Sequence, residues 1–386
     1  MTADPPEISD LAADGMRFQA ITPSPLCAPS RGAILTGLHG HNNGIVTDGG
    51  NSADLWRAKN LGHTVADWLH RAGWRTEGFG KGVNTVPLPA LTAQGWDAWH
   101  ESQPRVAGAD RYWLDVLTDQ AVAAIESTLG DRPLFLYFAP QSPHAPFVSD
   151  PKYRGAYDSI PLPEPPSMGR NGGKLSRGQV RKVTALFHKR LEMMRSVADS
   201  IGRIRDALER TGRAGDAYSF FVSDNGYSQG EGGRTNGKGQ PYAESVSVPA
   251  FVLGPDVPAG FVSDALIYNH DFAPTIAALA GVRPDRELDG RPFSALWRMP
   301  GSAWRRRVLL EHHDARALLF SGLETRAEKL IVWQDGGRAL YDLDLDPFEL
   351  DNRCAPNRDC GGRLMPVLDA LMHCAGRRCW ELETRP

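Results

Sequence analysis

A cysteine near the start of the chain stands where the N-terminus of a helix is expected. Cys27 precedes Pro29 and Arg31, and Gly37 follows further along. Proline suits the first turn of a helix and glycine suits its end, so this spacing predicts a helix that begins at Cys27. The free N–H groups and the dipole of such an end favour an anion. Taken alone, the segment also fits a buried cysteine before a short helix.

Two lysines and a histidine could bind and protonate an anion. Lys81 and Lys238 each lie between two glycines, which let the backbone approach a ligand closely. His144 lies between prolines, after an apolar segment, and an imidazole can donate a proton near neutral pH. Ordinary loop lysines and a packed turn histidine are the alternatives for these residues.

Oxygen ligands follow another apolar segment. Asp224, Asn225 and Gly226 come directly after the run Tyr218–Val222. Carboxylate and amide oxygens suit Ca²⁺ or Mg²⁺. A tight Asn-Gly turn explains the same three residues without a metal.

The apolar pattern predicts the elements that position these residues. Helices are expected at 61–72, 113–129 and 180–210, and strands at 74–81, 133–138 and 218–222. Apolar strands separated by helices indicate an α/β fold with a mostly parallel sheet and helices on both faces. Ligands of such sheets bind beyond the carboxyl ends of the strands. The segment 157–174 is expected to be a surface loop near the site.

The pattern of expected secondary structure changes after residue 300. Short strands are expected at 307–310 and 329–333, and a last helix at 365–373. We therefore expect a large α/β domain over 1–300 and a small C-terminal α+β subdomain over 301–386.

Composition excludes several classes of protein. The 386 residues include 43 Lys and Arg against 46 Asp and Glu, a net charge of -3, so no basic surplus points to nucleic acid or a membrane surface. No apolar stretch approaches the ~20 residues of a transmembrane helix. The first residues lack the basic start and apolar run of a signal peptide.

Four of the five cysteines crowd the end of the chain: Cys354, Cys360, Cys374 and Cys379. They could form two disulfides, a metal cluster or free thiols, and their spacing differs from that of common zinc sites. Because neighbours close the smallest loops, the favoured pairs are Cys354 with Cys360 and Cys374 with Cys379.

The string from Cys27 to Gly37 resembles the C-x-P-S-R signature of type I sulfatases, whose cysteine is converted to formylglycine. Further matches follow in the family's order: Gly80–Asn84, Gly95–Asp97, Pro143–Pro146, Ser223–Gly226, Gly237–Gly239 and Tyr341–Leu343. The chain looks most like bacterial arylsulfatases related to N-acetylglucosamine-6-sulfatases. The resemblance implies an alkaline-phosphatase-like fold and a sulfuric ester hydrolase.

The resemblance also implies roles for residues. Cys27, as formylglycine, is the nucleophile, and Arg31 reaches its diol and the metal-site carboxylates. Lys81 and Lys238 bind the sulfate oxygens, and His144 protonates the leaving oxygen. Asp224, Asn225 and position 27 are the expected ligands of one Ca²⁺ or Mg²⁺ ion. The implied partners are a small-molecule or carbohydrate sulfate ester and a formylglycine-generating enzyme, with neither nucleic acid nor membrane, in a secreted or periplasmic protein.

The chain departs from the family pattern in two places. Family members begin with a buried strand ending in two aspartates that bind the metal, and this sequence shows no such strand, which suggests an N-terminal truncation. Val83 also stands where many sulfatases have histidine, and Asn84 is expected to make a polar contact there. A non-catalytic sulfatase homologue and a formylglycine-dependent phosphonate or phosphodiester hydrolase are therefore the alternative functions.

Overall fold

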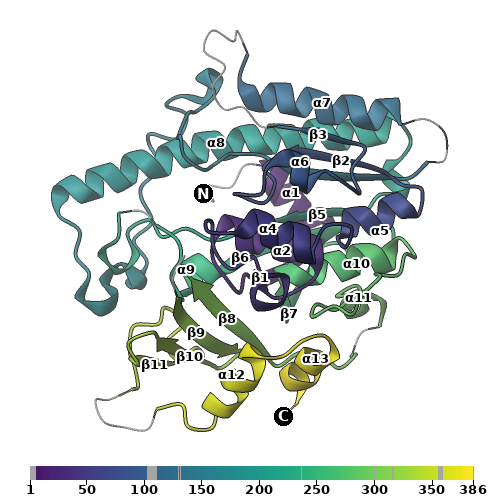
Figure 1. Cartoon of the computed structure of the whole chain (residues 1–386). Helices are drawn as coiled ribbons and strands as arrows, with labels where there is room; N and C mark the ends of the chain where they lie inside the picture. The colour runs from purple at the N-terminus through teal and green to yellow at the C-terminus, as the bar shows by residue number, and fades with distance from the viewer. Residues whose placement is uncertain are drawn as a thin grey trace.

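The computed structural model describes residues 6–101, 111–128, 130, 132–235, 237–299, 301–314, 317–354 and 360–385. Figure 1 shows helices packed around two sheets in the upper part of the view and a third sheet with two short helices below. The strands are β1 Met16–Ile21, β2 Arg75–Gly80, β3 Ala98–His100, β4 Leu134–Ala139, β5 Ser219–Val222, β6 Ser247–Leu253, β7 Phe261–Tyr268, β8 Arg307–His313, β9 Leu318–Thr325, β10 Glu328–Trp333 and β11 Arg338–Asp342.

The α-helices are α1 Pro6–Asp14, α2 Cys27–Thr36, α3 Gly40–Asn43, α4 Ser52–Lys59, α5 Val65–Arg71, α6 Leu88–Leu91, α7 Trp113–Ser127, α8 Arg177–Arg210, α9 Ala243–Val246, α10 Phe272–Leu279, α11 Ala295–Arg298, α12 Met365–Met372 and α13 Arg377–Thr384. Short 3₁₀ helices occupy η1 Pro151–Tyr153, η2 Pro166–Gly172, η3 Ala214–Asp216, η4 Glu231–Gly233 and η5 Asn269–Asp271. None of these described helices is both long enough and apolar enough to span a bilayer.

Strand pairing gives a parallel-rich architecture. One sheet has the order β3-β2-β4 and is parallel throughout. A second has the order β5-β6-β1-β7, in which β6 runs opposite to its neighbours β5 and β1, while β1 and β7 are parallel. The third, β11-β10-β9-β8, is antiparallel. The α/β fold with its C-terminal subdomain is confirmed.

Strand β4 shows why the sheet needs helices on both faces. Phe135 and Tyr137 pack with the cluster formed by α2, α5 and α10. Leu136 and Phe138 point to the opposite face and pack with α7 and α8. Successive apolar residues of β4 therefore pack against helices on both faces of the sheet, as expected for a strand between helical layers.

Local contacts shift some expected boundaries. The helix expected at 61–72 begins only at Val65, because Thr64 and Asp67 form a capping box, each side chain accepting from the other's backbone N–H. The expected loop 157–174 contains η2. Residue 129, the expected end of another helix, lies outside the described residues. The sequence pattern did not predict strands β1, β6 and β7.

The C-terminal sheet packs against both the larger α/β part of the chain and the last helices. Val308 and Leu310 of β8 pack with Ile21 and Tyr268, whereas Leu309 joins the side chains of α12 and α13. The expected pairs Cys354–Cys360 and Cys374–Cys379 are confirmed as disulfides. The boundary between residues 300 and 301 stays a prediction, and residue 300 lies outside the described chain.

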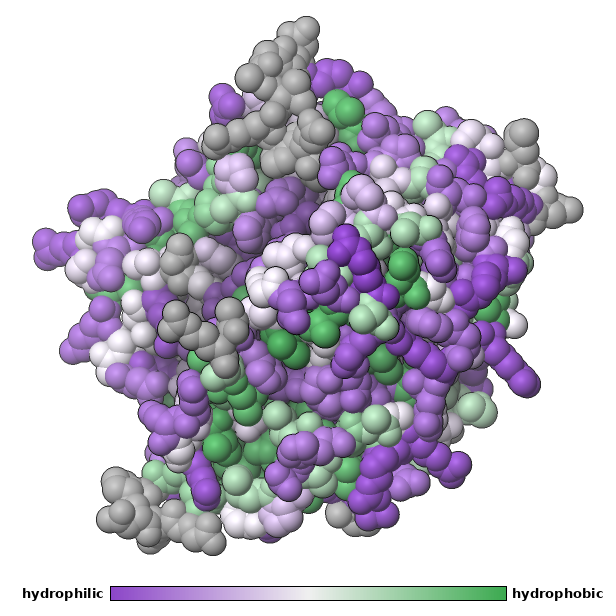
Figure 2. Space-filling model, viewed as in Figure 1, coloured by the Kyte–Doolittle hydropathy of each residue, from purple (hydrophilic) through white to green (hydrophobic). Residues whose placement is uncertain are grey.

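The face drawn in Figure 2 carries mainly hydrophilic residues, with hydrophobic ones in several small groups. Such a surface is ordinary for a globular protein.

Two apolar strands nevertheless keep one edge unpaired. Among the described residues, β4 pairs only with β2 and β5 only with β6. All residues of both strands are partly exposed, although their faces are packed against helices and neighbouring side chains. Unpaired edges of this kind offer hydrogen-bond donors and acceptors to a further strand. The expectation of an additional apolar strand remains a prediction, and these edges are where such a strand would pair.

We predict that adding an apolar strand ending in Asp-Asp, of about six residues, before residue 6 through a short linker raises the melting temperature by several degrees. Paired backbone groups and covered apolar edges give the stabilisation. Calorimetry would measure it, with an equally long Gly/Ser extension as control. Equal melting temperatures for the two extended forms would contradict the prediction.

Candidate active site around Cys27

Cys27 is the first residue of α2, as Pro29 and Gly37 predict. Every residue of the helix is buried, and Gly37 ends it in the left-handed conformation with φ 72°. Its N-cap, Leu26, supplies no side-chain hydrogen bond. The N–H of Ala28 instead donates to Asp48 Oδ1 at 2.7 Å. The cysteine thus sits at a buried helix start, close to a carboxylate.

Two ammonium groups converge on the sulfur of Cys27. Lys238 Nζ lies 2.6 Å and Lys81 Nζ 3.7 Å from Cys27 Sγ. Burial and then the charge of Arg31 lower the pKa of Lys81 from its usual value. Gly80 precedes Lys81 with φ 90°, and a Cβ there would lie 2.1 Å from the carbonyl oxygen of Ala139. Glycine is therefore required for the loop to approach β4 so closely.

Arg31 links three segments behind the cysteine. Its guanidinium donates to the carbonyl oxygen of Gly82 at 2.5 Å, to the side-chain oxygen of Asn84 and to the carboxylate of Asp224. Burial opposes its charge, but Asp224, Tyr137 and Cys27 together outweigh burial and raise the pKa of Arg31. Asn84 therefore makes a polar contact with Arg31, and its expected contact in place of the missing histidine stays a prediction.

The expected metal ligands lie just after β5. The carboxylate of Asp224 is shared with Arg31 and is partly exposed. Asn225 Oδ1 is buried and accepts no hydrogen bond among the described residues. An orphaned amide oxygen beside a carboxylate fits a hard cation in type, because Ca²⁺ and Mg²⁺ take oxygen ligands. Two protein oxygens fall short of the six to eight that Ca²⁺ takes, so further oxygen ligands are needed.

His144 lies on the loop after β4 and is exposed. Its Nδ1 contacts the carbonyl oxygen of Ala145 at 2.8 Å and the amide of Gln141 at 3.2 Å. Partial burial, together with the positive charges of Lys81 and Lys238, lowers the pKa of His144. The imidazole is thus close enough to the two lysines to sense their charge.

The structure brings the expected residues to one place, and their roles remain predictions. Sequence reasoning missed three supporting residues: Asp48, Tyr137 and Asn269. Asn269 Nδ2 donates to Ser30 Oγ of α2 at 2.5 Å and to the carbonyl oxygen of Asp224 at 3.2 Å. The burial of Tyr137 raises its pKa, so the phenol beside Arg31 stays neutral. These contacts join segments that are distant in sequence, so no local sequence pattern predicts them.

A cleft opens beside Lys81. It holds about 310 Å³ and is lined by residues 80–88 and Glu101. Lys81 and Asn84 belong to this wall, so the cleft adjoins the group of charged side chains around Cys27.

This fold and this set of side chains define an anion-handling α/β protein, and comparison with known proteins identifies the family. The sulfatase family model matches residues 2–282. The chain therefore belongs to the sulfatase family. A second model, the C-terminal region of N-sulphoglucosamine sulphohydrolase, matches residues 235–359.

Relatives with curated names are sulfatases. The chain is 28% identical to the extracellular sulfatase SULF-1 homolog of Drosophila melanogaster over 81% of its own length and 31% of that protein. It is 27% identical to human N-acetylglucosamine-6-sulfatase, over 77% of this chain and 61% of the relative. The chain thus spans less than two thirds of the length of these relatives.

Solved structures share the fold. One is a protein in complex with its substrate D-glucosamine-2-N,6-O-disulfate, with TM-score 0.81, 20% identity and coverage of 98% and 94% of the two chains. Another is the phosphonate monoester hydrolase of Agrobacterium radiobacter, with TM-score 0.76, 19% identity and coverage of 96% and 90%.

We predict that inorganic sulfate raises the melting temperature and that Lys238→Met weakens this effect at least about tenfold in apparent affinity, because a charged hydrogen-bond donor at the anion is lost. Differential scanning fluorimetry against sulfate concentration measures it. Lys174→Met, a change at an exposed lysine, is the matched control. The same sulfate dependence in both variants would contradict the prediction.

Proposed function

We propose that this protein hydrolyses sulfate esters through a formylglycine made from Cys27, with one Ca²⁺ or Mg²⁺ ion. The observation that carries the proposal is the convergence of Lys81 and Lys238 on Cys27 at the start of a buried helix. A sulfate ester must lose an alkoxide from an anionic centre, and fixed positive charge offsets the charge that develops there. Membership of the sulfatase family supports the same reaction.

Each residue of the site has its own proposed role in the reaction. Once hydrated, formylglycine supplies one hydroxyl whose oxygen attacks sulfur. The other hydroxyl later loses its proton and re-forms the aldehyde, which expels sulfate together with the first oxygen. Lys81 and Lys238 bind sulfate oxygens from the two glycine-flanked loops. Arg31 holds Asp224 and the loop carrying Lys81 and Asn84 in register with α2. His144 donates a proton to the departing alcohol oxygen, so that an alcohol rather than an alkoxide leaves.

The divalent cation would be held by Asp224, Asn225 and position 27. It would supply positive charge for the sulfate oxygens and the nucleophile. The buried, unpartnered Oδ1 of Asn225 supports this assignment. The protein residues named so far supply only part of the oxygen shell of such a cation.

We infer that the substrate is a sulfated carbohydrate. The human relative is an N-acetylglucosamine-6-sulfatase, and one structural neighbour holds a sulfated glucosamine. A formylglycine-generating enzyme is the partner required for conversion of Cys27. We also propose a secreted or periplasmic location, supported by the disulfides and by the name of the extracellular relative.

The competing functions are separable by one comparison. A phosphonate monoester hydrolase of Agrobacterium radiobacter shares this fold, and a formylglycine-dependent phosphonate or phosphodiester hydrolase is the competing enzyme. Faster turnover of an aryl sulfate than of an aryl phosphodiester by converted protein supports the sulfatase proposal, and the reverse order supports the other hydrolase. No turnover of either, with conversion established by mass spectrometry, favours the non-catalytic homologue.

We predict that coexpression with a maturing enzyme converts Cys27 to formylglycine and that Cys27→Ala abolishes aryl sulfate turnover while the fold persists. Alanine fits a helix start, so circular dichroism should not change. Peptide mass spectrometry reads the conversion. If the host expresses the maturing enzyme and the Cys27 peptide is found only as the free thiol, the assignment is contradicted. Aryl sulfate turnover by Cys27→Ala protein would contradict it as well.

We predict that His144→Ala slows hydrolysis of an alkyl sulfate by about 10²-fold or more but slows that of a nitrophenyl sulfate far less. Only the poor leaving group needs the proton. Because the pKa of His144 is lowered, its protonated form is lost at lower pH than for a free imidazole. Alkyl sulfate turnover should therefore be full below this pKa and fall as pH rises through it.

His188→Ala, a change on α8, is the control, since His188 bonds the carbonyl oxygen of Ile160 instead. Equal losses for the two substrates in His144→Ala would contradict a proton donor.

A further inference from the structure

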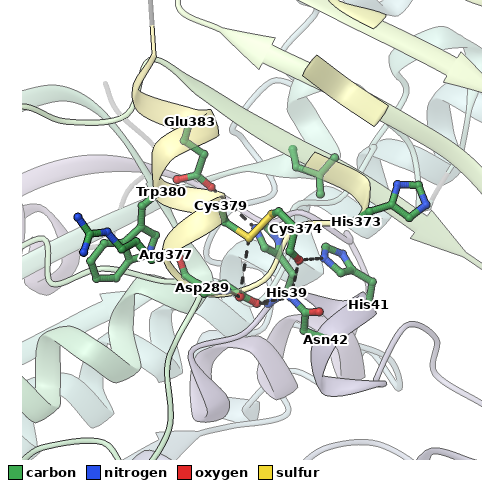
Figure 3. Close-up of a disulfide and its surroundings, with 12 residues drawn as sticks. His39, His41, Asn42, Asp289, His373, Cys374, Arg377, Cys379, Trp380 and Glu383 are labelled. Carbon is green, nitrogen blue, oxygen red and sulfur yellow. Dashed lines mark hydrogen bonds and ion pairs between the residues drawn. A yellow bond between two sulfur atoms is a disulfide. The ribbon is translucent and has the colours of Figure 1, made fainter. Parts of the chain in front are cut away.

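A second group of titratable side chains lies where the C-terminal helices meet the catalytic domain. His39 follows α2, His270 belongs to η5, and Glu383 lies on α13. All three are fully buried, at 0% exposure. Figure 3 shows Glu383 extending from its helix toward His39, beside the disulfide Cys374–Cys379. None of these residues takes part in the chemistry proposed at Cys27.

The polar atoms of this group are unsatisfied. Neither ring nitrogen of His39 or of His270 makes a hydrogen bond among the described residues, and neither does Glu383 Oε1. Buried polar atoms almost always have a partner, so five orphans in one place require an explanation. Their geometry suggests that one bound ion explains all of them. One possible ligand atom from each side chain lies within 4.8 Å of those of the other two.

The ring nitrogens are free to act as ligands. Neither nitrogen of His39 or of His270 is engaged in a hydrogen bond among the described residues, and a neutral ring presents a lone pair to a metal. Glu383 Oε2 is held by Arg305 at 3.0 Å, which leaves Oε1 facing His39 Nε2 at 3.8 Å.

The neighbouring His41 is already satisfied. Its Nδ1 contacts Glu311 at 2.8 Å and its Nε2 the carbonyl oxygen of Cys374 at 3.0 Å. An imidazole with a partner on both nitrogens is a poor ligand, so the orphaned set is His39, His270 and Glu383.

We propose that His39, His270 and Glu383 bind a Zn²⁺ ion that fastens α13 to the catalytic domain. Two imidazoles and a carboxylate are a common zinc ligand set, with bonds of about 2.0–2.2 Å. Those bonds bring ligand atoms to about 3.4 Å apart in a tetrahedral site. The three side chains therefore close slightly around the ion, by rotation of the rings. One ion satisfies an orphan on each residue and joins segments from three parts of the chain.

The site is distinct from the proposed Ca²⁺ or Mg²⁺ position, where the ligands are all oxygens. Nitrogen ligands favour zinc over those hard cations. Zinc here has a structural role, so its presence can be measured in Cys27→Ala protein, which the proposed function makes inactive. The outcome is thus independent of sulfatase activity.

The test is the zinc content of untagged Cys27→Ala protein expressed with added ZnCl₂ and passed through a mild chelating resin, measured by mass spectrometry of the metal. About one Zn²⁺ per chain is expected. His270→Gln and Glu383→Gln, each made in that protein, should lose the ion or weaken its affinity at least about tenfold. His373→Gln, at a histidine whose side chain is 77% exposed, is the matched control and should keep it.

Circular dichroism shows whether each variant is folded. If His270→Gln does not fold, Glu383→Gln still tests the proposal, because glutamine has nearly the same shape as glutamate. Addition of ZnCl₂ during refolding should raise the melting temperature of the parent and of His373→Gln but not of the ligand variants. A folded parent without zinc, or zinc retained in both ligand variants, would overturn the proposal. Zinc that binds only after reduction of Cys374–Cys379 would overturn it too, since it would assign the ion to the thiols near His39.

Discussion

The guanidinium of Arg31 joins the two sheets of the larger α/β part of the chain at the point where they carry the candidate site. It projects from α2 and bonds Gly82 and Asn84, which follow β2, and Asp224, which follows β5. These strands belong to different sheets. A buried guanidinium is tolerated only when its donors are satisfied and its charge is paired, so removing one partner is costly. The arrangement of Arg31 therefore fixes the loop after β2, the loop after β5 and the start of α2 together.

The same arrangement leaves positive charge around Cys27. Arg31 is paired with Asp224, but Lys81 and Lys238 point at a sulfur atom. Two ammonium groups at a buried helix start are a costly arrangement without an anion, and the proposed sulfate ester would offset that cost.

Local signals in the sequence predicted the parts of the site but not their assembly. Pro29 and Gly37 located α2, the glycines marked both lysines, and sequence proximity gave both disulfides. The capping box at Thr64 was readable and would have placed the start of α5. By contrast, the antiparallel β6 between β5 and β1 follows from sheet order, which periodicity does not encode. The partners of Arg31 and the group around His39 arise from contacts over long sequence distances, so only the folded structure shows them.

The most direct test of this account is a crystal structure of the protein with bound inorganic sulfate. The account predicts sulfate at the start of α2, with oxygen atoms within about 2.7–3.2 Å of the Nζ atoms of Lys81 and Lys238, and with Arg31 still bonded to Asp224. Sulfate that binds elsewhere at saturating concentration, while both lysines turn away from residue 27, would contradict it.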